Sequence, residues 1–410
     1  MKKLFSLGLA LILAVALLGS ALAEDVTITY ATFSASGAQE ETLKKMVEVF
    51  ESKNPGIKVD VQLTGYEDYF TKLATTVGGG NAPDVFEMNM ENFLAYMLRN
   101  ACADLSGLVD SANYSEGTLA AVSADGKLYA VPMSFSTCVL FYNKALFNQA
   151  GVDYPNDSWT WNDAQAAAEK IAALGDDIWG FYQPISYNEF YKAVKGNGGS
   201  LLNEDYTAFT VNSPENVAVL DAMLARVRGD GHVMPNKEEM AGRGDWDLFT
   251  EGKLGMLISG IWGFQTFSEK CTFDWDIVVE PGYAQKSTFF FANVNCVSPS
   301  SQKQEAAAKF ADAMGSDPDI VKLRLDASWE LPTIADQSKL KQYLEVTPPA
   351  NRKAVFDSMD FAAAPPALLE QGAVSEIIGN VLGTLETNDM TAQEALDEIQ
   401  AQLEDADLLN

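Results

Sequence analysis

Strand-like and helix-like patterns alternate along the start of the chain, and this order constrains the fold more than any other feature. Residues 26–30 alternate between apolar and polar side chains, the period of a β-strand. An apolar face with helical spacing follows over 43–50, and 57–63 alternates again. Strand, helix, strand in that order indicates a parallel unit, so we predict an α/β fold. Further helical patterns recur over 164–174, 217–227, 306–314 and 374–385.

The first residues have the pattern of a cleavable export signal. Lys2 and Lys3 precede an apolar run over 7–18, and the small-residue motif Ala21–Ala23 follows. We therefore expect residues 1–23 to be a signal peptide that is cut after Ala23. A lipid anchor needs a Cys at the cut, whereas the first Cys is Cys102, so the expected location is periplasmic or secreted.

Charge and missing motifs argue against several function classes. The chain has 28 Lys and Arg against 57 Asp and Glu, a formal net charge of −29, so we expect no nucleic-acid partner. The single histidine, His232, has no partner at metal or dyad spacing, and hydrolase-elbow, zincin and P-loop motifs are absent. We predict no catalytic residue, no metal and no cofactor. Export permits disulfides, but the pairing stays open for Cys102, Cys138, Cys271 and Cys296.

Aromatic residues cluster in segments that we expect to be loops. A ring can lie against the C–H face of a sugar while nearby amides and carboxylates bind its hydroxyls. The same rings can enclose a quaternary ammonium group through cation–π attraction. The clustered residues are Trp159, Trp161, Tyr182, Tyr187, Phe190, Tyr191, Trp246, Trp262, Phe289, Phe290, Phe291 and Trp329.

Several motifs, in a fixed order, carry a family resemblance. They are Ala82–Val85, Asp125–Pro132, Leu140–Phe147, Ala150–Val152, Thr160–Asp163, Asn197–Gly199, Phe249–Trp262 and Glu305–Phe310. Together they resemble family 1 of the extracellular solute-binding proteins of ABC sugar importers, the maltose-binding-protein-like family, over nearly the whole mature chain.

The resemblance implies a type II periplasmic-binding-protein fold, in which two lobes with hinge crossings enclose a central ligand cleft. The chain would cross between lobes near 136–140, 289–293 and 329–333. Lobe 1 would then comprise 24–136 plus 293–330, and lobe 2 would comprise 137–292 plus 331–410. Hinge closure around the ligand is the expected motion.

Position within the matched motifs also implies the ligand-binding residues. These are Phe33, Asn89, Glu91, Ser136, Tyr187, Asn188, Trp262, Asn293 and Trp329. Trp246, from the loop aromatics, and Glu330, a candidate counter-ion, complete the predicted set. Phe291-Ala292 and Trp329-Glu330 stand where relatives carry smaller groups, which we expect to narrow the cleft and favour a mono- or disaccharide.

The resemblance thus implies a non-enzymatic, monomeric substrate-binding protein of an ABC importer. It would capture a small carbohydrate, a mono- or oligosaccharide, outside the cytoplasmic membrane and deliver it to the permease. One alternative is a binding protein for a cationic ligand such as a polyamine or betaine, with Glu91 and Glu330 as counter-ions. Another is a glycosidase, which needs only two carboxylates that flank the scissile bond.

Overall fold

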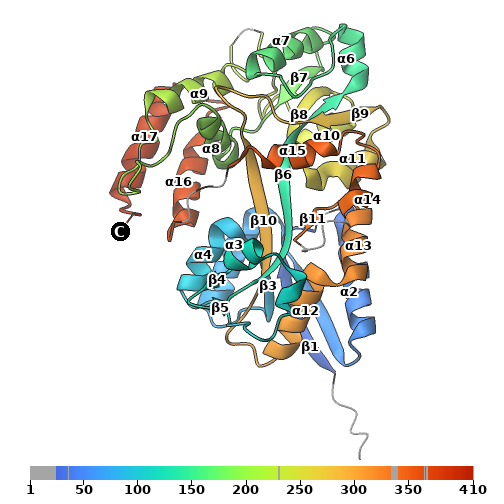
Figure 1. Ribbon diagram of the computed structural model, residues 1–410. Coiled ribbons are helices and arrows are strands. Elements are labelled where there is room, and N and C mark those ends of the chain that lie inside the picture. The colour runs from blue at the N-terminus through green and yellow to red at the C-terminus, as the bar shows by residue number, and fades with distance from the viewer. Residues whose placement is uncertain are drawn as a thin grey trace, which may run out of the picture.

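The chain forms two α/β lobes that lie one above the other in Figure 1. The computed structural model describes residues 25–35, 37–229, 231–333, 340–363, 365 and 368–409. The predicted signal peptide, 1–23, and its cut after Ala23 lie outside the described residues. We call the lobe that contains the first three strands the lower lobe, and the other the upper lobe.

The lower lobe begins with the predicted alternation of strands and helices. Its first elements are β1 (Val26–Thr32), α2 (Ala38–Lys53), β2 (Ile57–Leu63), α3 (Tyr66–Gly78), β3 (Val85–Asn89) and α4 (Met90–Leu98). β1 lies between β2 and β3 and is parallel to both, which confirms the predicted parallel unit. Short elements follow, namely η1 (Ser111–Asn113), α5 (Glu116–Ala120), β4 (Ser123–Ala124) and β5 (Lys127–Leu128). The chain returns to this lobe in α12 (Gln304–Ser316) and α13 (Pro318–Asp326).

The predicted helical face and the predicted second strand differ in how deeply they are buried. The apolar face of α2 is packed into the lobe, with Met46 and Phe50 at 0% and 1% exposure. β2 lies at the edge of the sheet, and its side chains alternate only between half-buried and exposed. The alternation of side chains with a period of two therefore predicted strand β2. Its position at the edge of the sheet depends on which strands pair with it, and a local sequence pattern does not show this.

Two long strands run from one lobe into the other, as Figure 1 shows. β6 (Val131–Asn143) pairs with β10 (Thr288–Val297) over its first half and with β8 (Leu254–Gly260) and β9 (Trp275–Val278) over its second half. β10 in turn pairs with β3 in the lower lobe. The short strand β11 (Leu331–Pro332) also pairs with β6, at Ser134 and Phe135. These strands connect the two lobes, and the exact division into lobe residues stays a prediction.

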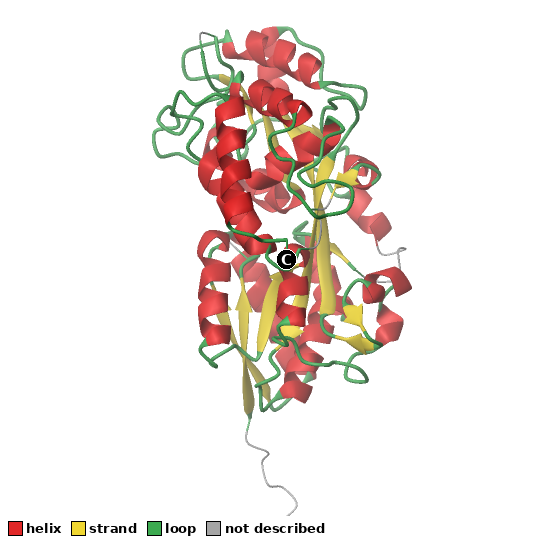
Figure 2. Ribbon diagram, turned by 90° about the vertical axis from the view of Figure 1, so that its left-hand side faces the viewer, coloured by secondary structure: helices red, strands yellow, loops and turns green. Residues whose placement is uncertain are grey.

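The upper lobe is built around β7 (Trp179–Tyr182), which is parallel to β8, together with β9 and the short strand β12 (Ala362–Ala363). Helices cover this part of the sheet (Figure 2). They are α6 (Lys144–Ala150), α7 (Trp161–Ala172), α8 (Tyr187–Gly196), α9 (Pro214–Leu224), α10 (Asp245–Thr250), η2 (Ile261–Gly263), α11 (Phe264–Lys270), α14 (Leu340–Glu345), α15 (Lys353–Met359), α16 (Gln371–Leu382) and α17 (Ala392–Asp405).

Each lobe has its own hydrophobic core. The lower core is centred on residues such as Phe86 and Phe310, and the upper core on residues such as Phe141 and Trp275. Trp262 packs against both cores. Two separate cores joined by a few strands allow the lobes to move as rigid bodies, and the predicted α/β class with two lobes is confirmed. None of the described helices combines the length and apolar character that a membrane span requires.

Candidate functional site

Polar and aromatic side chains from both lobes begin helices that directly follow strands. In the lower lobe, Gln39, Tyr66 and Glu91 lie in the first turns of α2, α3 and α4, which follow β1, β2 and β3. In the upper lobe, Tyr187 begins α8 after β7, and Trp262 lies in η2 directly after β8. Open α/β sheets place binding groups at these carboxyl ends of their strands.

The two lobes touch at Gln39 and Trp262. The amide Nε2 of Gln39 donates a 2.7 Å hydrogen bond to the backbone carbonyl of Trp262. The Trp262 indole meets the ring of Phe291 on β10 edge-to-face, at 5.3 Å between centroids and 83° between planes. The indole also lies directly over Gly260, where an added Cβ would be 1.9 Å from the ring, so only glycine fits beneath it. These contacts hold Trp262 between the lobes.

A second contact joins the lobes at α4 and α16. The Arg99 guanidinium lies 2.6 Å from a Glu370 carboxylate oxygen in an exposed ion pair. A groove of about 600 Å³ runs between α3, α4 and the start of α16, lined by residues of both lobes such as Tyr96 and Ala373. The lobes therefore approach each other at two separate places.

An aromatic surface surrounds Phe33 at the end of β1. The Phe33 ring meets Tyr66 and Tyr69 edge-to-face at 5.4 and 5.0 Å between centroids. Tyr66 is 50% exposed even though its ring packs against Phe33. Its hydroxyl accepts a 3.5 Å hydrogen bond from the amide of Asn89. An exposed ring next to an amide is the combination expected of a sugar-binding surface.

Asn89 and Glu91 lie together where β3 leads into α4. The Asn89 side chain caps α4 by accepting a 3.3 Å hydrogen bond from the Asn92 backbone amide. Glu91 Oε2 is buried and has no hydrogen-bond partner among the described residues. Burial raises the pKa of Glu91 to about 7. Near neutral pH this carboxyl is therefore only partly ionised.

Tyr187 contacts α16, the helix whose start meets α4 of the lower lobe. Its hydroxyl accepts a 2.8 Å hydrogen bond from the amide of Gln371, at the start of α16. Burial raises the pKa of the Tyr187 hydroxyl. Asn188 follows on α8 and is partly buried.

The hinge strands contribute Ser136 and Asn293. Ser136 is fully buried on β6 opposite Phe291 of β10, and its hydroxyl has no partner among the described residues. Asn293 on β10 is paired in register with Asn89 of β3. The structure thus brings strands that carry Asn89, Ser136 and Asn293 side by side at the junction of the lobes.

Among the buried polar atoms that form no hydrogen bond with any described residue, four belong to side chains named above. They come from the lower lobe, the hinge and the upper lobe, and they are Gln39 Oε1, Glu91 Oε2, Ser136 Oγ and Gln371 Oε1. A buried polar atom without a partner costs about 1–3 kcal/mol. A ligand rich in hydroxyl groups would remove that cost by pairing with them.

Glu330 lies behind the hinge strands in a charged cluster. Its carboxylate accepts hydrogen bonds from the hydroxyl of Ser134 and, at 3.4 Å, from the amide of Asn293. A guanidinium nitrogen of Arg324 lies 3.6 Å from it, and both side chains are buried. Burial raises the pKa of Glu330 to about 7 although Arg324 opposes the shift. Glu330 already has a cationic partner within the protein, which weakens its expected role as counter-ion to a ligand.

Trp329 packs against the lower core. It is 1% exposed, and the Arg324 guanidinium lies 4.8 Å from its ring. Its indole Nε1 is buried without a hydrogen-bond partner among the described residues. The narrowing of the cleft by Trp329-Glu330 stays a prediction. Trp246, on α10, donates to the Ser259 hydroxyl at 3.1 Å and meets Phe267 edge-to-face. For Trp246, Trp329 and Glu330, contact with a ligand stays a prediction.

Three residues of this site were missed from the sequence: Gln39, Tyr66 and Gln371. Gln39 and Tyr66 follow predicted strands in the first turn of the next helix, a position that could have identified them. Gln371 had no such signal, because its approach to Tyr187 depends on packing between α8 and a segment 184 residues later in the chain.

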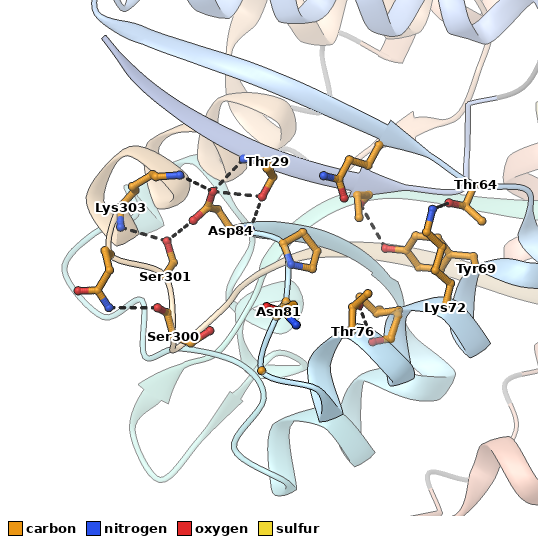
Figure 3. Close-up of a pocket in the computed structure, with 17 residues that line it drawn as sticks. Thr29, Thr64, Tyr69, Lys72, Thr76, Asn81, Asp84, Ser300, Ser301 and Lys303 are labelled. Carbon is orange, nitrogen blue, oxygen red and sulfur yellow. Dashed lines mark hydrogen bonds and ion pairs between the residues drawn. The ribbon is translucent and has the colours of Figure 1, made fainter. Parts of the chain in front are cut away.

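A separate cavity of about 470 Å³ lies within the lower lobe (Figure 3). Its polar groups are largely satisfied by one another around Asp84, whose carboxylate accepts hydrogen bonds from the Thr29 backbone at 2.9 Å and from Ser301 at 2.6 Å. Lys303 lies 3.2 Å from the same carboxylate. These bonds tie β1 and β3 to the segment before α12, which is a structural role.

Within the part of the chain that the structure describes, no group of His, Cys, Asp and Glu side chains is arranged to hold a metal ion. The four cysteines, whose pairing the sequence left open, are all free thiols, and Cys102, Cys138 and Cys296 are buried. The chemistry that this arrangement offers is hydrogen bonding and ring stacking.

A model of the bacterial extracellular solute-binding proteins matches residues 34–320. A binding protein of Brucella abortus is 30% identical over 254 residues, which cover 60% of each chain, so the chain spans about 60% of the length of this relative. The arabinooligosaccharide-binding protein of Bacillus subtilis is 24% identical over 253 residues, 58% of this chain and 56% of that protein.

Among solved structures, an ABC substrate-binding protein of Listeria monocytogenes in complex with cycloalternan is similar over nearly the whole chain. The TM-score is 0.88 and the identity is 41%, and the match covers 93% of this chain and 99% of that one. At this identity the likeness extends beyond the fold.

Proposed function

This chain belongs to the bacterial extracellular solute-binding proteins, and from that membership we propose that it captures a carbohydrate between its two lobes for an ABC importer. The ligand-contacting residues in this proposal are Phe33, Asn89, Glu91, Ser136, Tyr187, Asn188, Trp262 and Asn293, joined by Gln39, Tyr66 and Gln371. The family comprises substrate-binding proteins and not enzymes.

Four unpartnered polar atoms, from both lobes and the hinge, support the proposal. Gln39, Glu91, Ser136 and Gln371 each bury an oxygen that lacks a partner among the described residues. A neutral sugar supplies hydroxyl groups that both donate and accept, and so it can pair with amide, carboxyl and hydroxyl oxygens at once. The exposed ring of Tyr66 and the indole of Trp262 add apolar faces on opposite lobes.

The related proteins favour an oligosaccharide over a monosaccharide. The Listeria relative is in complex with cycloalternan, and the Bacillus relative is named for arabinooligosaccharides. We propose a short oligosaccharide as the ligand.

Capture is proposed to be reversible and without bond cleavage. In this proposal the protein works as a monomer outside the cytoplasmic membrane, after removal of the signal peptide, and transfers its ligand to permease subunits.

A thermal-shift screen tests this function. The purified protein is heated with sugars, oligosaccharides that include cycloalternan, polyamines and betaines, each at a concentration far above typical dissociation constants. A ligand selective for the folded state raises the melting temperature by mass action. We expect a saccharide to raise it and to be recovered intact. A shift with cations alone, or turnover of the saccharide, would overturn the proposal.

A further inference from the structure

Two of the four thiols lie together in the lower lobe. Cys102 follows the end of α4, and Cys296 lies on β10, where it is paired in register with Phe86 of β3. Both belong to the lower core, whereas Cys138 belongs to the upper core and Cys271 packs against it. Four thiols can pair in three ways, and only one of these keeps each pair within a lobe. That arrangement joins Cys102 to Cys296.

The backbone holds the two cysteine segments side by side. The Ala103 amide donates a 2.8 Å hydrogen bond to the Val297 carbonyl, one residue after each cysteine. The first segment is also fixed at Leu105, whose amide donates a 2.7 Å bond to the carbonyl of Leu128 on β5. Segments joined by such bonds lie about 5 Å apart, and disulfides span about 4.4–6.8 Å between Cα atoms. The spacing therefore suits a disulfide.

The side chains of Cys102 and Cys296 meet between these segments. Burial, and then a hydrogen bond with the Cys102 thiol, raise the pKa of the Cys296 thiol. For Cys271, by contrast, burial alone raises the pKa of the thiol to about 12. Cys102 is 4% exposed and Cys296 is fully buried, and the structure holds both as free thiols. Their sulfur atoms are thus neighbours within the core.

The location of the family gives this pair of thiols a chemical consequence. The chain belongs to a family of extracellular proteins. Disulfides form and persist outside the cytoplasm, whereas thiols inside it are kept reduced. Two thiols that meet in an exported protein are therefore placed to be oxidised, and the same pair in the cytoplasm is not.

We propose that Cys102 and Cys296 form a disulfide when the protein is exported, that this bond stabilises the lower lobe, and that Cys138 and Cys271 stay as thiols. The bond ties the segment that follows α4 to the hinge strand β10. The inference goes beyond the proposed function and does not depend on the ligand, because both cysteines lie in the lower core.

Oxidation requires a disulfide donor outside the membrane, of the class of thiol–disulfide oxidoreductases. The thiolate of one cysteine attacks the donor disulfide and forms a mixed disulfide, and one donor sulfur leaves and takes up a proton. The second cysteine thiolate then displaces the other donor sulfur and closes the S–S bond. The protein loses two protons and two electrons, and the donor gains both as two thiols.

The timing of this exchange follows from the burial of Cys296. A thiol with a raised pKa in an apolar core is unreactive, so the exchange takes place while the lower lobe is still folding. Once the core has closed, the bond is shielded from reductants in solution. The disulfide is therefore a permanent structural bond and not a switch.

Counting the thiols by mass spectrometry tests the pairing. The protein is exported with its own first 23 residues, purified without reductant, unfolded and alkylated with iodoacetamide before and after reduction. We expect two alkylated cysteines without reduction and four after it. We also expect linked peptides that contain Cys102 and Cys296 and are lighter by two hydrogen atoms than the separate peptides. The chain from residue 24 onward, made in a reducing cytoplasm, is the control and should show four thiols throughout.

Four alkylated cysteines in the unreduced exported protein would overturn the proposal. A linked pair that includes Cys138 or Cys271 would overturn it as well. Neither result depends on whether the protein binds a saccharide, so the failure of this proposal and that of the proposed function are distinguishable.

The melting temperature gives a second measurement. A bond between Cys102 and Cys296 closes a loop of roughly 200 residues in the unfolded chain, so it should raise the melting temperature by roughly 5–15 °C. Exported protein that has been unfolded and refolded in dithiothreitol should lose this increment. Cys271→Ala should respond to dithiothreitol like wild type, whereas the double variant Cys102→Ala, Cys296→Ala should not respond. Equal melting temperatures for exported and reduced wild type would overturn the stabilising role, and this comparison holds even if the double variant fails to fold.

Discussion

The side chain of Gln39 reaches from the lower lobe to the backbone carbonyl of Trp262 in the upper lobe, and the hydrogen bond is 2.7 Å long. Gln39 is 2% exposed, so this bond is protected from water. It is a direct link between the first turn of α2 and the segment that follows β8. Because it exists only when the lobes meet, it couples ligand affinity to closure.

Gln39→Leu should weaken ligand binding by roughly five- to thirtyfold. The substitution removes a buried hydrogen bond worth about 1–2 kcal/mol in the closed form, while the open form loses nothing. Isothermal titration gives the dissociation constant. Gln393→Leu, on the exposed face of α17, is the matched control because Gln393 bonds only to Asp397 of its own helix. Equal affinities for Gln39→Leu and wild type would show that the hydrogen bond between Gln39 and Trp262 does not couple ligand affinity to lobe closure.

Trp262→Ala should weaken binding by roughly 1 to 3 kcal/mol, the size of a buried aromatic hot spot. The indole packs against both cores, and the loss should therefore appear in the affinity more than in the stability of either lobe. Titration and urea unfolding measure the two quantities separately. Trp179→Ala, which removes a ring that stacks on His232 in the upper lobe, should leave the affinity unchanged. A Trp262→Ala protein that binds normally once folded would assign the indole to core packing alone.

The exposed ion pair between Arg99 and Glu370 should contribute little to closure. Both side chains are substantially exposed, 54% and 38%, and such pairs contribute about 0–1 kcal/mol. Arg99→Ala should change the dissociation constant less than roughly threefold, and the remaining effect should disappear at high salt. A tenfold loss that persists at 1 M salt would contradict this ranking of the two contacts between the lobes.

Stability should decrease with rising pH through Glu91. Its pKa is about 7 in the folded protein against an ordinary value of 4.5, so the folded state holds its proton more tightly than the unfolded state. Between about pH 4.5 and 7 the unfolded chain loses the Glu91 proton while the folded protein keeps it, so stability falls across that window. Glu91→Gln should flatten the dependence of the melting temperature on pH there. Glu330 also has a raised pKa, so some decrease should remain in the variant. Parallel pH profiles for the two proteins would refute the assignment.

Arg324→Met should destabilise the lower lobe by about 3–5 kcal/mol, because Glu330 would remain buried without its cationic partner. The double variant Arg324→Met, Glu330→Gln should recover much of that loss, since a neutral amide tolerates the site better. Urea unfolding gives both free energies. A single variant as stable as wild type would show that Ser134 and Asn293 alone satisfy Glu330.

Local patterns predicted the elements of this chain but not their long-range contacts. The helical face over 43–50 and the strands around it were recognised because burial in them follows a period that the sequence displays. The exposed position of β2 at the edge of the sheet was not predicted, because it depends on which strands pair with each other.

The residues of the candidate site also fall into those that were predicted from the sequence and those that were missed. The family resemblance implied Phe33, Asn89 and Glu91, and the structure places them in one region of the lower lobe. Gln371 was missed, because only the fold brings it to Tyr187. The contact between the Trp329 ring and Arg324 was also not predicted, because it depends on packing that follows the hinge crossing.

A crystal structure of the protein with the saccharide that gives the largest thermal shift tests directly whether the ligand lies between the lobes. We expect intact sugar density there, with hydroxyl groups within hydrogen-bond distance of Gln39, Glu91 and Gln371 and a ring face against Trp262. Density confined to the outer surface of one lobe, or a cleaved sugar in the site, would contradict it.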